Sequence, residues 1–279
     1  MSIIALFHDR NSSRGRSVMK ALSGGIAQSG EGHKVHEYTE SEYRGHISED
    51  IVCWYGLSGN LMQLGRDVWG STKPNVFFDL PYWGRKREPY PQHHRFSVNG
   101  HQPTRYFQHG REGDRLSQFE RVFKPWRTGK HKEILVAGMS EKQCQAWGLG
   151  SSLKFHTAMI AGIQEARNVD VAWRPKPACL VSSQPIPGTR YANGPLEAEL
   201  IRSGCVWTYR SNTAIDGLIA GIPCVVQGDH PTRVLSEREV SLVAREQFCA
   251  DLAYCQVSMQ ELRNGWAWKH IQREIQRVM

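Results

Sequence analysis

Short apolar runs alternate with segments of helical periodicity along the first 80 residues. The runs predict strands at residues 3–7, 34–38, 51–55 and 75–80. Between them, apolar residues recur every three or four positions, which predicts helices near residues 18–26 and 61–68. Repeated strand–helix units of this length are typical of a parallel sheet covered by helices.

The alternation returns in the second half of the chain, after an irregular stretch rich in Pro, Gly and His. Strands are predicted at residues 133–137, 169–173, 205–209 and 222–226, and helices at 151–166, 196–201, 212–220 and 259–278. The pattern predicts an α/β fold with two Rossmann-like βαβ domains. We place these domains at residues 1–128 and 129–256, and we expect a C-terminal helix within residues 257–279.

The composition excludes several classes of protein. A chain of 279 residues, 40% of them hydrophobic, can bury a sizeable core and is neither disordered nor fibrous. No stretch approaches the roughly 20 apolar residues of a membrane helix, and the first residues do not read as a signal peptide. The seven Cys include no CxxC pair, which argues against a disulfide framework or a zinc site. We therefore expect a cytoplasmic protein with no stable membrane insertion.

The net charge of +8 is concentrated in one segment, residues 85–132, which holds twelve Lys and Arg against four Asp and Glu. Aromatic residues and five His are interleaved with these bases. Basic side chains neutralise phosphates and aromatic rings stack on exposed bases, so the segment predicts a surface for DNA or another polyanion. A solvated basic linker between domains is the alternative. The candidate contact residues are Arg85, Arg87, Arg95, Asn99, His101 and Arg105.

A polar turn between the strand at 205–209 and the next helix is a candidate phosphate site. The first N–H groups of a helix lack intrahelical partners and carry a positive partial charge, which suits an anion. The candidate residues of this turn and of the first helical turn are Arg210, Ser211, Asn212, Thr213 and Asp216. Asp216 would accept hydrogen bonds from sugar or ribose hydroxyls. An ordinary capped helix without a ligand is the alternative.

A second basic turn follows the strand at 169–173. Arg174 and Lys176 lie at the carboxyl end of that strand, where open α/β sheets bind their ligands. Arg can hold a phosphate with two hydrogen bonds, and Lys can act as a point charge. The alternative is a solvated turn.

The residues Ser211, Asn212, Thr213, Asp216, Gly221 and Pro223 resemble the donor-binding unit of two-domain, GT-B-type glycosyltransferases. The Arg-Pro-Lys-Pro turn at 174–177 is similar to an Arg-Pro-His-Pro turn in some of them. The resemblance implies a GT-B fold with an interdomain cleft and a nucleotide-sugar donor, expected to be a UDP-sugar, whose diphosphate meets residues 211–213. Asp216 stands where the family more often has Glu. The resemblance also implies that the acceptor binds the N-terminal domain and that the C-terminal helix packs back on it.

Two carboxylates of the first half are candidates for the base that deprotonates an acceptor hydroxyl. Asp79 lies near the end of the strand predicted at 75–80, and partial burial would raise its pKa toward neutral pH. Its alternative role is to form the turn before Pro81. Asp9 and its neighbour His8 follow the first strand and are the second candidate. We find no Asp-x-Asp motif, so transfer without a metal ion or other cofactor is expected.

The polar segment 95–104 looks like segments of bacteriophage DNA-modifying transferases. That resemblance implies transfer of a sugar to a hydroxymethylated base in DNA, swung out of the base stack. Two alternatives stay open. One is a glycosyltransferase acting on a glycan or envelope polysaccharide, and the other is a non-enzymatic nucleic-acid-binding protein on the same scaffold.

Overall fold

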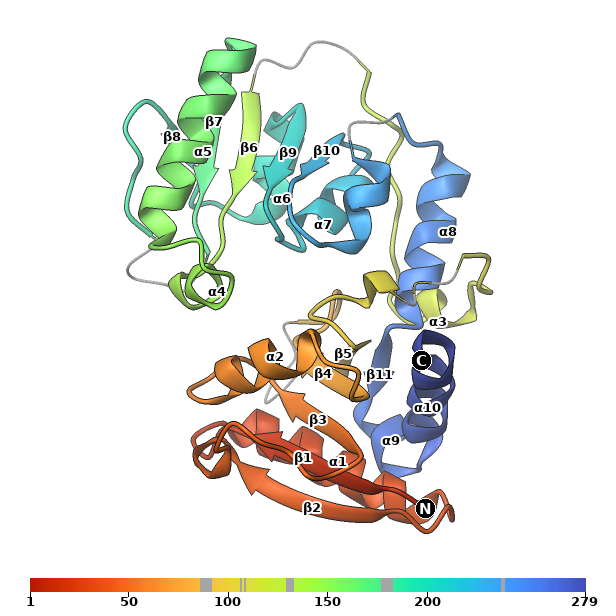
Figure 1. The fold of residues 1–279 in the computed structure, drawn as a ribbon. Helices are drawn as coiled ribbons and strands as arrows, with labels where there is room; N and C mark the ends of the chain where they lie inside the picture. The colour runs from red at the N-terminus through yellow and green to blue at the C-terminus, as the bar shows by residue number, and fades with distance from the viewer. Residues whose placement is uncertain (86–91, 106, 108, 129–132, 177–182, 237–238) are drawn as a thin grey trace. The chain divides into compact units, whose positions relative to one another are not determined.

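The computed structural model describes the chain except for residues 86–91, 106, 108, 129–132, 177–182 and 237–238. The chain forms two compact units, each with its own sheet (Figure 1). Unit 1 comprises Met1–Phe119 and Ala250–Met279, and unit 2 comprises Glu120–Cys249. The predicted α/β fold with two Rossmann-like domains is therefore confirmed. The predicted interdomain cleft stays a prediction.

Unit 1 contains a six-stranded sheet of order β11-β5-β4-β3-β1-β2. Its strands are β1 (Ile3–His8), β2 (Lys34–Thr39), β3 (Ile51–Tyr55), β4 (Asn75–Asp79), β5 (His93–Val98) and β11 (Gln256–Ser258). Strands β1 to β4 are parallel, whereas β5 is antiparallel to both β4 and β11. The chain leaves β1 toward β2 on one side, and β3 lies on the other. Ligands of open α/β sheets bind at such a point, outside the carboxyl ends of the strands.

Helices pack on both faces of this sheet, because its central strands β1, β3 and β4 are buried on both sides. They are α1 (Ser13–Gln28), α2 (Leu61–Trp69), α3 (Asp114–Ser117), α9 (Met259–Arg263) and α10 (Trp266–Val278), with 3-10 turns at Glu40–Glu42 and Pro103–Arg105. Trp69 of α2 packs on Trp54 and Phe77 on one face. On the other face, His270 of α10 packs edge-on against Phe96.

The C-terminal segment belongs to unit 1. Strand β11 pairs with β5, so residues 250–258 complete the first sheet, and the division of the chain differs from the boundaries predicted at 128 and 256. The single helix predicted at 259–278 is wrong, because Gly265 adopts a positive φ of 81° that separates α9 from α10. Gly25 of α1 lies so close to α9 that a Cβ there would be 1.9 Å from the Leu262 carbonyl oxygen.

Unit 2 contains a fully parallel five-stranded sheet of order β10-β9-β6-β7-β8. The strands are β6 (Glu133–Ala137), β7 (Asp170–Arg174), β8 (Arg190–Tyr191), β9 (Cys205–Thr208) and β10 (Cys224–Val226). The helices are α4 (Glu141–Ala146), α5 (Ser152–Arg167), α6 (Leu196–Arg202), α7 (Thr213–Ile219) and α8 (Leu242–Ala253), with a 3-10 turn at Pro231–Leu235. Helix α8 contains the point where the chain passes from unit 2 to unit 1.

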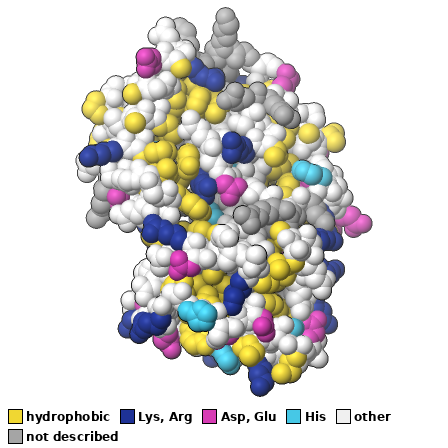
Figure 2. All heavy atoms as spheres, in the orientation of Figure 1, with side chains coloured by type: hydrophobic (Ala, Val, Ile, Leu, Met, Phe, Trp, Pro, Cys, Tyr) yellow, Lys and Arg dark blue, Asp and Glu magenta, His cyan; other side chains and the backbone are white. Residues whose placement is uncertain are grey.

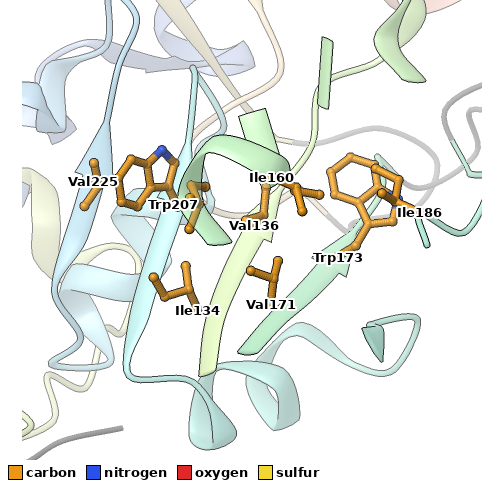
Figure 3. Packing of buried hydrophobic residues seen from close by; sticks show 9 residues of the cluster. Ile134, Val136, Ile160, Val171, Trp173, Ile186, Trp207 and Val225 are labelled. Carbon is orange, nitrogen blue, oxygen red and sulfur yellow. The ribbon is translucent and has the colours of Figure 1, made fainter. Parts of the chain in front are cut away.

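The core of unit 2 lies mainly between the sheet and α5 (Figure 3). Side chains from β6, β7, β9 and β10 line this face, including Val136, Trp173 and Trp207, and Ile160 of α5 packs on them. Helix α7 covers the opposite face, where a Cβ on Gly217 would lie 2.9 Å from Cys224 Sγ. Among the helices of the described part of the chain, none is long and apolar enough to span a bilayer.

Candidate functional site

The strand order of unit 2 reverses between β6 and β9, which is where a sheet of this order binds ligands. The Thr208 side chain fixes the loop after β9 against β6. Its Oγ1 donates a hydrogen bond of 2.8 Å to the Ala137 carbonyl and accepts one of 3.0 Å from the Ser211 amide. The predicted donor residues 210–213 therefore follow directly at this edge of the sheet.

Arg210 has an unusual environment for a cation. Its guanidinium carbon lies 3.8 Å from the ring centroid of Trp147, the residue that follows α4. Its Nε and Nη1 atoms are buried and have no hydrogen-bond partner among the described residues. Burial lowers the pKa of Arg210, although the Asp229 carboxylate opposes this effect. A buried guanidinium with unsatisfied N–H groups is suited to an incoming anion.

Hydroxyl and amide groups lie next to Arg210 in the sequence. Ser211 Oγ lies 3.0 Å from Thr213 Oγ1, and Asn212 Oδ1 lies 3.1 Å from His230 Nε2. His230 is only 1% exposed, and its Nδ1 accepts a hydrogen bond from the Thr232 amide, so its Nε2 donates to Asn212. His230 thus links the loops after β9 and β10.

Sequence reasoning missed His230. The available signal was its position in a Gly-Asp-His-Pro turn just after a strand of the same sheet. A turn at the carboxyl end of a parallel strand lies at the ligand-binding edge, whatever its composition. Trp147 was missed as well, because it follows a short helix and nothing in its local sequence points to Arg210.

The loop after β6 is held by α5. The Met139 amide donates to His156 Nε2 at 3.1 Å, and Ser152 Oγ donates to the Met139 carbonyl at 2.9 Å. His156 Nδ1 donates to the Ser152 carbonyl at 2.6 Å. Burial lowers the pKa of His156 to about 4, which keeps the ring neutral and Nε2 available as an acceptor. The side chains of His156 and Ser152 thus fix the loop after β6, beside the loop after β9. Sequence reasoning missed both of them.

Arg174 is the last residue of β7 and Lys176 follows it, on the other side of β6 from β9. Arg174 Nη1 donates to the carbonyls of Ala192 and Gly194, at 3.1 and 2.7 Å. Burial lowers the pKa of Arg174. Arg174 therefore holds the segment after β8, whereas Lys176 is exposed. Asp216 is half-buried in the first turn of α7.

In unit 1, the candidate base Asp79 and the candidate acceptor residue Arg95 form an ion pair. Asp79 Oδ2 lies 2.9 Å from Arg95 Nη2, and Asp79 Oδ1 accepts a hydrogen bond from the Leu80 amide. Arg95 is 3% exposed, and its Nη1 donates to the His101 carbonyl and to Gln102 Oε1. Burial opposes the charge of Arg95, but Asp79 and Tyr82 together outweigh this effect and raise the pKa of Arg95. Both side chains are thus engaged in contacts within the unit.

Asp9 lies at the switch point of unit 1, immediately after β1. It is half-buried, and its Oδ1 accepts a hydrogen bond of 2.8 Å from the Asn11 amide. Tyr55, at the end of neighbouring β3, has its hydroxyl 3.4 Å from His94 Nδ1. Burial lowers the pKa of His94 to about 3 and raises that of Tyr55, so both are neutral at neutral pH. Among the described residues, Asp79 is ion-paired to the buried Arg95, whereas no ion pair to a buried arginine is found for Asp9.

The other candidate acceptor residues are distributed between interior and surface. Asn99 and His101 are buried: Asn99 Oδ1 accepts from the Asn75 amide, and His101 stacks on Phe77. Arg85 donates to the carbonyls of Pro81 and Tyr82. Arg87 lies outside the described residues. The backbone of Arg105 ends the 3-10 turn at Pro103–Arg105.

Arginines of the basic segment also bind acidic residues of the C-terminal segment. Arg111 pairs with Glu274 at 2.9 Å, and Arg115 pairs with Glu261 at 2.7 Å. On the face shown in Figure 2, Lys and Arg side chains are interspersed with acidic ones. Three bases of the segment, Arg95, Arg111 and Arg115, thus form ion pairs within unit 1, and these contacts do not support the interpretation of the segment as a DNA-binding surface.

No group of three or more His, Cys, Asp and Glu side chains is placed to hold a metal ion in the part of the chain that the structure describes. Transfer without a metal ion stays a prediction.

Comparison with known proteins identifies the fold. No protein-family model matches the sequence, and no curated protein matches it. Two solved structures of KpsC from Thermosulfurimonas dismutans are similar. Its β Kdo 2,7 transferase has a TM-score of 0.52 and 13% identity, covering 95% of this chain and 99% of that chain. Its β Kdo 2,4 transferase has a TM-score of 0.50 and 11% identity, covering 89% of each. The chain is thus similar in fold to these glycosyltransferases, which supports the GT-B-type architecture expected from the sequence.

Proposed function

We propose that the protein is a glycosyltransferase that uses a nucleotide-sugar donor and binds the donor diphosphate on unit 2. The observation that carries the proposal is Arg210, at the point where the strand order reverses, whose Nε and Nη1 atoms are buried and have no hydrogen-bond partner among the described residues. The similarity in fold to transferases supports the same reaction class.

Each residue of the loop after β9 has a role in this proposal. Arg210 neutralises the diphosphate, and one hydroxyl of the hydrogen-bonded pair Ser211 and Thr213 donates a hydrogen bond to one of its oxygens. These groups stabilise the negative charge that grows on the diphosphate as the bond to the sugar breaks. Asn212, held by His230, keeps the loop in place, and Asp216 accepts hydrogen bonds from hydroxyls of the donor. Lys176, at an exposed position, adds a positive charge, and Arg174 orders the neighbouring loop.

On unit 1, Asp9 is the better candidate for the base. Its carboxylate accepts one backbone hydrogen bond, whereas Asp79 is paired with Arg95. In the proposed reaction, Asp9 takes the proton of an acceptor hydroxyl while the hydroxyl oxygen bonds to the anomeric carbon. The bond from that carbon to the diphosphate breaks, and its electron pair leaves with the diphosphate. General base catalysis of this kind contributes about 10²–10⁴-fold.

A glycan is the acceptor that the observations favour. Arg95, Asn99 and His101, expected to contact DNA, are buried, and other arginines of the basic segment are paired internally. The proteins of similar fold are named as Kdo transferases. Transfer to a hydroxymethylated base in DNA is the competing acceptor, since the segment 85–132 remains basic overall.

Calorimetric titration with UDP, CMP, GDP and dTDP, and then with the corresponding sugar nucleotides, tests the donor site. At least one should bind, and Arg210→Gln should weaken it about tenfold or more. Arg167→Gln is the matched control, because Arg167 lies over Trp207 at 4.9 Å in the same unit. The proposal fails if no nucleotide binds or if Arg210→Gln binds as tightly as the unchanged protein.

Mass spectrometry of candidate acceptors after the reaction identifies the acceptor. The protein is incubated with the bound sugar nucleotide and, separately, with oligosaccharides, hydroxymethylated DNA and ordinary DNA. A hexose-sized or larger increment on an oligosaccharide supports the favoured acceptor. An increment confined to hydroxymethylated DNA overturns the choice of a glycan and establishes the DNA-modifying reaction.

A further inference from the structure

Arg210 lies against an indole ring and a glycine. Its guanidinium carbon lies 3.8 Å from the Trp147 ring centroid. A Cβ on Gly228 would lie 2.7 Å from Arg210 Cγ and 2.8 Å from its Nε. The Gly228 amide donates to the Tyr209 carbonyl at 2.8 Å, which holds the glycine in this position. The arginine therefore occupies a slot with little room for another rotamer.

A protein ordinarily holds a buried guanidinium with carboxylates or carbonyl oxygens. Arg95 and Arg115 in unit 1 follow this rule, with ion pairs of 2.9 and 2.7 Å. Arg210 differs, because its guanidinium lies over an aromatic face, which attracts a cation without occupying its N–H groups, and its buried Nε and Nη1 have no hydrogen-bond partner among the described residues. The stacking thus fixes the direction of the guanidinium and leaves its hydrogen-bonding edge unused.

We propose that Trp147 is a positioning residue that holds Arg210 in the orientation required to bind the donor diphosphate. This inference rests on the proposed function. A long arginine side chain loses rotamer freedom when it binds a ligand, and a chain already held in one orientation loses less. Trp147 contributes to affinity by this route, through Arg210 and without a contact to the diphosphate.

Trp147 is itself held in place by α4 and by the loop after β6. Its amide donates to the Gln143 carbonyl at 3.2 Å, at the end of α4. Ser140 caps that helix, and the preceding Met139 is held by His156 and Ser152 of α5. The backbone of Trp147 therefore has a fixed place relative to β6, and Arg210 follows β9, the strand beside β6. The pair joins the two loops of the switch point.

A double-mutant cycle separates this role from a general effect on folding. Binding of inorganic pyrophosphate and of the cognate nucleotide is measured for the unchanged protein, Trp147→Leu, Arg210→Gln and the double variant. We expect Trp147→Leu to weaken both ligands about tenfold, and to change nothing further in the Arg210→Gln background. Trp147→Phe, which keeps an aromatic face, should recover most of the affinity.

Trp126→Leu is the matched control, since Trp126 lies under Arg245 at 5.4 Å elsewhere in unit 2. Its ligand affinity should match that of the unchanged protein. The NMR resonance of the Arg210 Nε–H gives a ligand-free readout, because the ring current of Trp147 shifts it and Trp147→Leu should remove that shift.

The possible results separate the two proposals. If Trp147→Leu binds as the unchanged protein does, or weakens binding equally in both backgrounds, the positioning role is overturned while nucleotide binding through Arg210 stands. If pyrophosphate binding depends on the coupled pair but no nucleotide binds, the positioning role holds and the proposed function fails. If neither ligand binds, both are overturned.

Discussion

Asp79 and Arg95 lie opposite each other on β4 and β5, and their side chains form an ion pair of 2.9 Å. Because Arg95 is buried, loss of its partner would leave a charge without compensation. We expect Asp79→Asn to lower the free energy of unfolding by about 1–3 kcal/mol, less than for a fully buried pair because Asp79 is 29% exposed.

Urea denaturation measures this loss. Glu40→Gln is the control, because Glu40 pairs with the exposed Arg10 and such a pair contributes less than about 1 kcal/mol. Equal losses in the two variants would show that burial of Arg95 has no energetic consequence.

The same ion pair leads to a kinetic prediction. Asp9→Asn should lower kcat by about 10²-fold or more, because the base is removed. Asp79→Asn, assayed at a temperature where it is folded, should change kcat by less than about tenfold. Both variants are measured in the transfer assay with the identified donor. A larger loss of kcat in Asp79→Asn than in Asp9→Asn would assign the role of base to Asp79.

Two adjacent glycines of α1 provide a packing test. A Cβ on Gly25 would lie 1.9 Å from the Leu262 carbonyl oxygen, whereas a Cβ on Gly24 would have no neighbour within 4 Å. Gly25→Ala should therefore destabilise unit 1 by about 2 kcal/mol or more, and Gly24→Ala should stabilise it by about 0.5–1 kcal/mol. Thermal and urea unfolding compare them directly, and a stable Gly25→Ala protein would contradict the close approach of α1 and α9.

The buried His156 should make the free energy of unfolding depend on pH. Burial lowers its pKa from the ordinary 6.5 to about 4, so the unfolded chain binds more protons between these values. The free energy of unfolding should fall as the pH drops from 6.5 toward 4, by up to about 1.4 kcal/mol per pH unit for this one group. His94, with a pKa of about 3, adds a contribution of the same sign.

Urea denaturation at several pH values between 4.5 and 6.5 measures this slope. His156→Gln should reduce this slope by the contribution of one proton, and the contribution of His94 should remain. His46→Gln is the control, because His46 lies at an exposed position. An unchanged slope in His156→Gln would mean that His156 is protonated in the folded state.

Gly228 gives an independent way to displace Arg210. Gly228→Ala places a Cβ where the arginine side chain now lies, so the guanidinium must move. Nucleotide affinity should fall about tenfold, and the Arg210 Nε–H resonance should shift. Gly162→Ala in α5, where a Cβ would have no neighbour within 4 Å, should leave both unchanged. Full affinity in Gly228→Ala would show that the slot is not required.

Most of the sheet framework follows from local sequence. Strands β3 and β6 lie at the residues predicted, because buried parallel strands read as continuous apolar runs. β11 was not predicted: it has three residues, and its partner β5 lies far away along the chain. The long helix at 259–278 was wrong because an internal glycine is compatible with a helix until its φ is known.

A site residue could be predicted from the sequence only where its side chain suits a ligand and its place directly after a strand is visible in the sequence. Arg210 was found because it follows a strand and precedes a helix. Arg95 looked like a surface base, since nothing local shows that β5 places it opposite Asp79. The contact between Trp147 and Arg210 depends on β9 lying beside β6, a pairing of strands separated by the whole of β7 and β8. Such contacts are set by tertiary structure, and single-sequence patterns do not encode them.

The division of the chain has a consequence for the order of events during synthesis. Unit 2 is one continuous stretch, Glu120–Cys249, and all its strands are available once that stretch has left the ribosome. Unit 1 emerges first, yet its sheet must wait for β11 to pair with β5, and α1 must wait for α9. The half of the molecule that is translated first is therefore the last to be completed, and until then the outer edge of β5 is open to pairing with other chains.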